Sequence, residues 1–411
     1  MNPFTEKILV FDDVVIIPGL SRVEPNQVDL STSLTERIKL CIPVVSSPMD
    51  MVTEAELAIK LAKLGGLGVI HRNISVEEQV DQVRKVKNVD KVYLTEEYED
   101  PGRIVRLEEA GSGYRLIVEK PRNVLLEEIS EISAYLRLIS GYPIKPTIDE
   151  NGRLMVGAAI SPFDVQRIEK LSKKADVLVV DVAHAHNENV ISSLAKIAPT
   201  LESDLIVGNI GTKQAALDII SRVEHVSGLR VGVSSGSICS TGEVTGAAAP
   251  TLWAVMQVRE ALEELGLHGK IPILADGGIR SPSDIAKSLI SGASATMLGR
   301  LLAGAKESAS PIISIGGRNY KLYRGMASSS AVRKRYASDR YSGTVKRIPE
   351  GVEALVDYTG SLTEIIERIV NTLQASLGYA GASSIRESWN AKLGVLSESA
   401  KKEIKPHDLV L

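Results

Sequence analysis

A complete structural unit lies in the stretch Pro272-Ile-Leu-Ala-Asp-Gly-Gly-Ile-Arg-Ser-Pro-Ser-Asp-Ile-Ala-Lys-Ser-Leu-Ile-Ser-Gly-Ala-Ser-Ala-Thr-Met-Leu-Gly-Arg300. A short apolar run ends in the loop Asp276-Gly277-Gly278, and the amphipathic pattern of residues 283–290 predicts a helix capped by its first serine. A second apolar run then ends in Gly299-Arg300. Strand, polar loop, helix and strand in this order build parallel sheets, so the stretch predicts an α/β fold.

Apolar runs of this kind occur eight times, and most precede a helical pattern such as that of residues 213–220. Eight strands with intervening helices is the count of a TIM (β/α)8 barrel, whose reactive groups follow the strands. A doubly wound sheet also alternates strands and helices, but it does not explain polar residues after so many strands. We therefore predict a TIM barrel with strands at residues 43–46, 67–70, 154–158, 177–181, 205–208, 229–233, 272–275 and 295–298.

The chain between the second and third predicted strands is too long for one helix. Residues 74–89 predict that helix. The alternating segments 104–107 and 114–118 predict a hairpin, and residues 124–138 predict an amphipathic helix. An additional α+β unit therefore interrupts the barrel at this point.

We accordingly predict a TIM-barrel catalytic domain formed by residues 1–91 and 146–411. Residues 92–145 form a small inserted subdomain of unknown role. Within the catalytic domain, residues 327–348 are rich in Ser, Arg and Tyr and poor in apolar side chains, which predicts a mobile flap.

Composition excludes several classes of partner. The 411 residues include 48 Lys and Arg against 51 Asp and Glu, a formal net charge of -3, so we expect neither nucleic acid nor an acidic membrane surface. No run approaches the ~20 apolar residues of a membrane span, and the N-terminus lacks a signal-peptide pattern. We expect a soluble, cytoplasmic protein. Its two cysteines indicate no disulfide framework.

Cys239 is the candidate nucleophile. It follows the predicted strand 229–233 in a loop of small residues, between Gly236 and Thr241, which is not typical of a cysteine that fills a core. Loop N–H groups favour the thiolate, the reactive form of the side chain. Cys41 lies in an apolar run and is interpreted as a small buried hydrophobe.

Two glycine-bearing loops predict a phosphate site. Asp276-Gly277-Gly278 and Gly299-Arg300 follow the last two predicted strands, where barrels commonly bind phosphate through backbone N–H groups. Asp276 beside them suits a sugar diol. The pair His184 and His186 lacks companions at ligand spacing, so we predict no zinc site.

An ordered set of motifs closely resembles the IMP dehydrogenase / GMP reductase family. The resemblance covers about residues 8–92 and 146 to the end, in family order. One motif alone would be weak, but the whole set is specific. The motifs are Phe11-Asp-Asp-Val14, Ser46-Ser-Pro-Met-Asp50, Gly65-Gly-Leu-Gly-Val-Ile-His71, Val156-Gly-Ala-Ala159, Gly236-Ser-Ile-Cys239, Ala275-Asp-Gly-Gly-Ile-Arg280, Tyr323-Arg-Gly-Met326 and Pro349-Glu-Gly351.

The resemblance implies a barrel that binds a purine nucleoside 5′-monophosphate and passes a hydride between the base C2 and a nicotinamide cofactor. Cys239 is implied to bond covalently to C2. Thr241, Arg340 and Tyr341 are implied to serve the hydrolytic step. Implied nucleotide contacts are Ser47, Met49, Asn209, Arg230, Ser237, Asp276, Gly277, Gly278, Gly299, Arg300, Tyr323, Gly325, Met326, Glu350 and Gly351.

The cofactor implied by the resemblance is NAD, or NADP for a reductase. Asp181 resembles the residue that holds the nicotinamide ribose, and Ala183 and Glu243 complete the implied cofactor contacts. The family also implies a homotetramer. A monovalent cation such as potassium is implied on the backbone of Ser234, Gly236 and Cys239.

Several positions depart from the family pattern. The dehydrogenases usually have glycine where this chain has Ser234, which puts potassium activation in doubt, and Gly242 replaces the usual Arg or Gln. The insertion at 92–145 is less than half as long as the usual tandem nucleotide-sensing pair. Allosteric control by purine nucleotides is therefore not assumed.

Three functions remain open from the sequence. The leading one is oxidation of IMP to XMP with NAD, because the family's dehydrogenases carry an Arg-Tyr dyad and Arg340-Tyr341 falls at its position. The alternative reaction is reduction of GMP to IMP and ammonia with NADPH. A non-catalytic nucleotide-binding paralogue is the third. A second pair, Arg335-Tyr336, leaves the register of the dyad open.

Overall fold

The computed structural model describes residues 7–89, 103–110, 113–119, 137–139, 142–328, 330–331 and 351–404. Of the three short ranges between 103 and 139, only the backbone is described. No helix in these described parts of the chain is long and apolar enough to cross a membrane.

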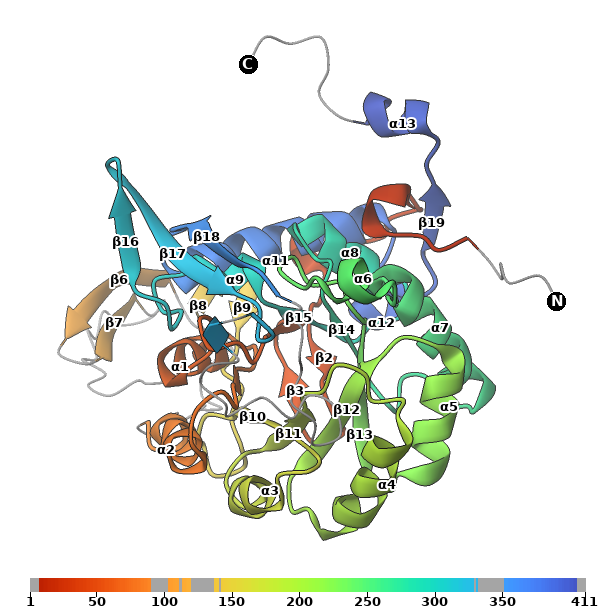
Figure 1. Cartoon of the computed structure of the whole chain (residues 1–411). Helices are drawn as coiled ribbons and strands as arrows, with labels where there is room; N and C mark the ends of the chain where they lie inside the picture. Colours follow the sequence, from red (N-terminus) through yellow and green to blue (C-terminus); the bar gives the residue numbers. More distant parts are fainter. Residues whose placement is uncertain are drawn as a thin grey trace.

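Eight parallel strands form the centre of the molecule (Figure 1). Their hydrogen-bonded order is β4, β15, β14, β13, β12, β11, β10, β5, and a bridge between Val45 and Leu67 joins the first strand to the last. The sheet is therefore closed, and the predicted TIM barrel is confirmed. The strands are β4 (Val44–Ser46), β5 (Val69–Ile70), β10 (Gly157–Ile160), β11 (Val177–Val180), β12 (Asp204–Ile210), β13 (Val226–Val231), β14 (Ile273–Asp276) and β15 (Ala295–Leu298).

Helices surround the barrel and begin where the sequence supplies caps (Figure 1). At α2, Ser75 and Glu78 form a reciprocal capping box. At α8 the cap is Ser281, followed by Pro282, so the expectation that Ser283 caps this helix is wrong by two residues. The helices are α1 (Ala55–Lys63), α2 (Val76–Lys87), α3 (Val165–Ser172), α4 (Glu188–Ile197), α5 (Lys213–Arg222), α6 (Thr241–Thr245), α7 (Thr251–Glu264), α8 (Pro282–Ile290), α9 (Arg300–Ala303), α11 (Leu362–Tyr379), α12 (Ile385–Ser388), α13 (Glu398–Glu403) and the 3-10 turns η1 (Phe11–Asp13), η2 (Pro25–Gln27) and η3 (Ala198–Thr200).

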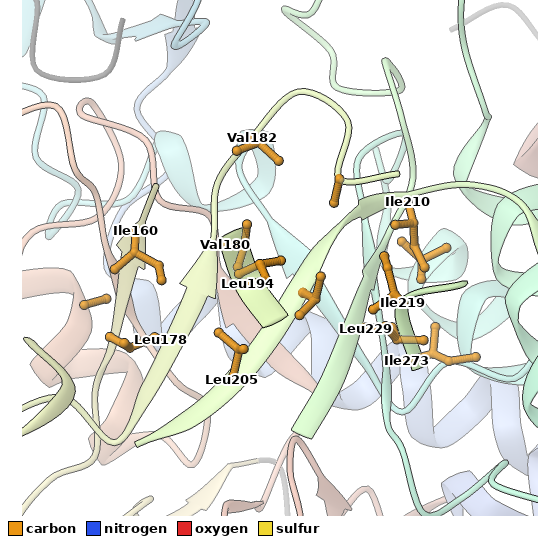
Figure 2. Packing of buried hydrophobic residues seen from close by; sticks show 14 of the residues in the cluster. Ile160, Leu178, Val180, Val182, Leu194, Leu205, Ile210, Ile219, Leu229 and Ile273 are labelled. Carbon is orange, nitrogen blue, oxygen red and sulfur yellow. The ribbon is translucent and has the colours of Figure 1, made fainter. Parts of the chain in front are cut away.

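Both faces of the barrel strands are buried, which explains their continuous apolar runs. In β11, Val177 and Val179 belong to the cluster that fills the barrel interior. Leu178 and Val180 alternate with them and pack in the layer between strands and helices, where Figure 2 shows them with Leu194 of α4. The two apolar layers hold the strands in place. The polar residues at the ends of the strands are not needed for this packing and can serve binding and catalysis.

Smaller sheets flank the barrel. The predicted hairpin is present as β6 (Arg103–Ala110) and β7 (Gly113–Glu119). The helix predicted for 124–138 is wrong at its end, because Arg137 and Leu138 lie in strand β8; residues 124–136 lie outside the described part. Cross-strand pairing with β9 overrides the amphipathic pattern there. The remaining strands are β1 (Val14–Ile17), β2 (Thr32–Ser33), β3 (Lys39–Leu40), β8 (Arg137–Ile139), β9 (Tyr142–Ile144), β16 (Ile312–Ile315), β17 (Arg318–Arg324), β18 (Glu353–Asp357) and β19 (Lys392–Val395).

Candidate active site

A cavity of about 1070 Å³, open to solvent, lies at the carboxyl ends of the barrel strands. Most residues singled out from the sequence meet there, although they come from positions 47 to 326 of the chain. The singled-out residues that line it are Ser47, Met49, Asp181, Ala183, Asn209, Arg230, Ser234, Gly236, Ser237, Cys239, Thr241, Asp276, Gly277, Gly278, Gly299, Arg300, Tyr323, Gly325 and Met326.

Two of the implied site residues in the described part of the chain do not line this cavity. Gly351 lies at its edge, where its backbone forms a bridge with Cys239. Glu243 lies exposed in α6 and does not contribute to the lining. Arg340, Tyr341 and Glu350 fall outside the described residues, as does nearly all of the predicted flap.

Cys239 opens into the cavity. Its amide donates to the carbonyl oxygen of Gly236 at 3.0 Å, which closes a tight turn after β13, and its side chain is exposed. The Sγ atom lies 3.4 Å from the hydroxyl of Thr241, the first residue of α6, and 3.8 Å from that of Ser234. The thiol is therefore both accessible and flanked by two hydroxyl groups, an arrangement suited to a nucleophile.

The glycine loops line the cavity with backbone, because neighbouring atoms leave no space for side chains at Gly277 and Gly299. Gly277 and Gly278 have φ angles of 86° and 70°, which side chains rarely adopt, and a Cβ on Gly277 would come within 2.6 Å of Ser235. A Cβ on Gly299 would lie 2.9 Å from the Tyr323 hydroxyl. These backbone positions can thus face an anion directly.

Tyr323 supplies a hydroxyl donor at the same place. Its side chain is buried, which raises the pKa of its phenol to about 12, although a hydrogen bond with Ser237 partly offsets the rise. The two hydroxyl oxygens lie 3.4 Å apart. The phenol therefore stays protonated at neutral pH and can donate to a phosphate oxygen.

A network of buried charges forms the floor of the cavity. The Oδ2 atom of Asp276 accepts hydrogen bonds from Arg230 Nε at 2.9 Å and from Asn209 Nδ2 at 2.8 Å. Arg230 reaches on to Asp181 at 3.3 Å, and Arg72 donates to the other oxygen of that carboxylate at 3.3 Å. Opposite charges thus alternate and compensate one another out of water. The sequence analysis missed Arg72, whose only signal was its place just after a predicted strand.

A second buried cluster supports the neighbouring wall, and no individual role was predicted for its residues. Arg324 holds both carboxylate oxygens of Asp50, and Asn73 donates to one of them at 2.9 Å. Burial alone would raise the pKa of Asp50, but these hydrogen bonds outweigh it and lower the pKa below its ordinary value. The Asp50 amide also lies 3.4 Å from Sδ of Met326, so the cluster positions a residue that lines the cavity.

The ligands implied for a cation on the Cys239 loop are backbone oxygens of Ser234, Gly236 and Cys239. The carbonyl oxygen of Gly236 already accepts an amide hydrogen, and the hydroxyl of Ser234 accepts the N–H of Gly242. In the described ranges, no three His, Cys, Asp or Glu side chains converge as metal ligands. His186 instead pairs with Asp218, at 2.7 Å. Potassium binding stays a prediction from the resemblance.

Comparisons with known proteins identify the family of this chain. The model of the IMP dehydrogenase / GMP reductase domain matches residues 8–407. An inosine-5′-monophosphate dehydrogenase of Korarchaeum cryptofilum is 41% identical, with 98% of this chain and 97% of that protein covered. Proteins of the same name from Thermoplasma acidophilum and Borreliella burgdorferi are each 38% identical, over 98% and 99% of this chain and 94% and 98% of their own lengths. The chain therefore belongs to the IMP dehydrogenase / GMP reductase family.

Proposed function

We propose that this chain oxidises IMP to XMP with NAD, within guanine nucleotide synthesis. The observation that carries the proposal is the exposed Cys239, which shares one cavity with the glycine loops and Tyr323. Eight relatives, at 33 to 41% identity over nearly the whole chain, are named inosine-5′-monophosphate dehydrogenase. The GMP reductase reaction therefore becomes an outcome to be tested.

The chain's own residues supply the substrate site. Backbone N–H groups of the loops at Gly278 and Gly299, with the hydroxyls of Ser237 and Tyr323, donate to the phosphate. Asp276 accepts from the ribose, because its bonds with Arg230 and Asn209 are made by one carboxylate oxygen, Oδ2. With the phosphate and ribose held, the base extends toward Cys239.

Covalent chemistry then follows at C2. The Cys239 thiolate would add to C2 of the base. NAD, which Asp181 and Ala183 would hold, would supply the two-electron acceptor for the hydride at C2. Water then attacks the covalent intermediate at C2, and XMP departs as the thiolate is released. Thr241 lies beside the sulfur, at 3.4 Å, where it can orient this water. Arg340 and Tyr341 complete the hydrolytic step by resemblance and lie outside the described residues.

Asp181 and Ala183 would hold NAD. Both line the cavity on the β11 side, and the carboxylate of Asp181 is fixed by Arg72 and Arg230. A fixed acceptor suits a ribose diol, so these residues fit the cofactor. Glu243 stays a proposed contact from the resemblance alone.

The decisive experiment supplies each substrate pair to the purified protein. We expect NADH and XMP from IMP with NAD, and no oxidation of NADPH with GMP. NADPH oxidation with GMP, without NADH from IMP, would assign the reductase reaction instead. Nucleotide binding without turnover in either mixture would favour the non-catalytic paralogue.

Replacing Tyr323 with phenylalanine tests the phosphate site. We expect KM for IMP to rise about 10- to 100-fold with kcat little changed, because a hydrogen bond to a charged group is lost equally from ground and transition states. Steady-state kinetics measure both constants. Tyr320→Phe, on the same strand and outside the cavity lining, is the matched control. A fall in kcat at unchanged KM would contradict the assignment.

We also propose that the chain assembles as a homotetramer. Exposed apolar side chains gather where the two ends of the described chain meet. Leu20 and Tyr379 are 79% and 71% exposed, and the neighbouring Gly19 donates its N–H to the Tyr379 carbonyl at 2.8 Å. Val395 of β19, which pairs with β1, is also exposed. Light scattering should give four times the mass of 44.2 kDa.

A further inference from the structure

Ser234 adopts a backbone conformation that is unusual for its residue type. Its φ angle is +59°, in the left-handed region where a Cβ is unfavourable. Among the described residues other than glycine, only His225 shares a positive φ. A serine at this position therefore costs conformational free energy that a glycine would not. We expect its side chain to make a contact that offsets this cost.

The Ser234 hydroxyl makes two contacts. Its oxygen accepts the N–H of Gly242, in the first turn of α6, and it lies 3.8 Å from Sγ of Cys239. Because an amide can only donate, the hydrogen of this hydroxyl remains available for another acceptor. The sulfur of Cys239 lies within the distance of hydrogen bonds to sulfur.

Gly242 leaves the space that this hydroxyl needs. A Cβ at position 242 would lie 3.0 Å from the Ser234 oxygen, closer than side chains normally approach. Glycine is otherwise a poor choice inside a helix, because it costs backbone entropy. The serine is locally unfavourable because it lies in the left-handed region, and the glycine because it lies in a short helix. Both residues are needed for one contact, the hydrogen bond from the Gly242 N–H to the Ser234 hydroxyl.

We propose that Ser234 is a positioning residue for the reaction. Its hydroxyl ties the Cys239 loop to the start of α6 and contacts the sulfur of Cys239, which holds the sulfur toward the cavity. This inference rests on the proposed function only through the role of Cys239 as the nucleophile.

The test is the reactivity of Cys239 toward iodoacetamide, measured by mass spectrometry on the protein without substrates. Ser234→Gly removes the hydroxyl and suits the φ of +59°, so the backbone is relieved rather than strained. We expect its alkylation rate at neutral pH to fall about three- to tenfold, as for the loss of one hydrogen bond, while its melting temperature does not fall. Ser240→Ala, beside Cys239 and without a capping bond to α6, should alkylate like the wild type.

Gly242→Ala provides a second, independent arm. In the wild-type background its Cβ displaces the Ser234 hydroxyl, so the alkylation rate should fall. In the Ser234→Gly background it has nothing to displace, so no further change is expected. Equal alkylation of the wild type and Ser234→Gly would overturn the proposal, and so would the same effect of Gly242→Ala in both backgrounds.

Turnover separates this inference from the proposed function. With IMP and NAD, Ser234→Gly should slow the first turnover at saturating IMP while KM for IMP changes little. A merely structural role would instead lower the melting temperature and raise KM. If the wild type makes no NADH from IMP, the proposed function fails, whereas the alkylation rates still decide the role of Ser234.

Discussion

Cys239→Ala will reduce the rate of NADH formation from IMP on the order of 10⁴-fold or more. Without the sulfur, C2 of the base cannot become tetrahedral, so no hydride can leave it. The cavity's phosphate and ribose donors are untouched by this substitution, and IMP should therefore still bind. NADH absorbance measures turnover, and calorimetry measures the retained affinity for IMP.

The other cysteine provides the control for this prediction. Cys41 is half-buried, and burial raises the pKa of its thiol although the amide of Lys145 partly offsets the rise. Cys41→Ala should keep turnover. In the wild type mixed with IMP and NAD, mass spectrometry of the quenched protein should find the nucleotide on Cys239 alone. Turnover of Cys239→Ala within about tenfold of the wild type would end the covalent proposal.

Arg340→Ala should uncouple the two halves of the reaction. We expect the first turnover of NADH to keep its rate, because hydride transfer needs only Cys239 and bound nucleotides. The steady-state rate should fall about 10²- to 10⁴-fold, since the water that attacks the covalent intermediate loses its general base. Rapid mixing resolves the initial burst from the slow phase, and the covalent adduct should accumulate.

Arg335→Ala decides the register of the dyad. If Arg340 is the base, Arg335→Ala should turn over like the wild type. If Arg335→Ala instead shows a burst followed by slow turnover, and Arg340→Ala turns over normally, the dyad is Arg335-Tyr336. Loss of the burst itself in Arg340→Ala would contradict a role confined to hydrolysis.

The sequence predicted the barrel well because its strands are buried on both faces. Continuous runs such as Val177–Val180 stand out from the amphipathic helices between them, and strand ends were placed to within a few residues. Residues 204–210 form a longer strand than expected, since Ile210 pairs with Val231 of β13 beyond the apolar run, after an irregularity in the register at Asn209. The end of the helix predicted for 124–138 was wrong because Arg137 and Leu138 pair with the next strand, β9, and this cross-strand pairing overrides the amphipathic pattern.

Residues of the candidate site could be predicted from the sequence where a chemically distinctive residue directly follows a predicted strand. Cys239, Asp276 and the glycine loops carry that signal locally. Arg72 and Arg324 do not, because their importance depends on carboxylates 109 and 274 positions away in the chain. Ser234 appeared only as a departure from a pattern, and its contact with Gly242 required the folded loop.

The closure of the barrel has a consequence for how the chain reaches its native state. Strand β4, near the start, is completed by β15, whose pairing joins Thr296 to Val44. Such distant pairings form slowly, and a growing chain cannot make this one until most of it has been synthesised. We call the junction between β4 and β15 the seam of the barrel. Ser47, which follows β4, and Gly299, which follows β15, both line the cavity. A nucleotide that binds across the seam would stabilise only closed molecules, so IMP should act as a folding ligand that protects newly made protein.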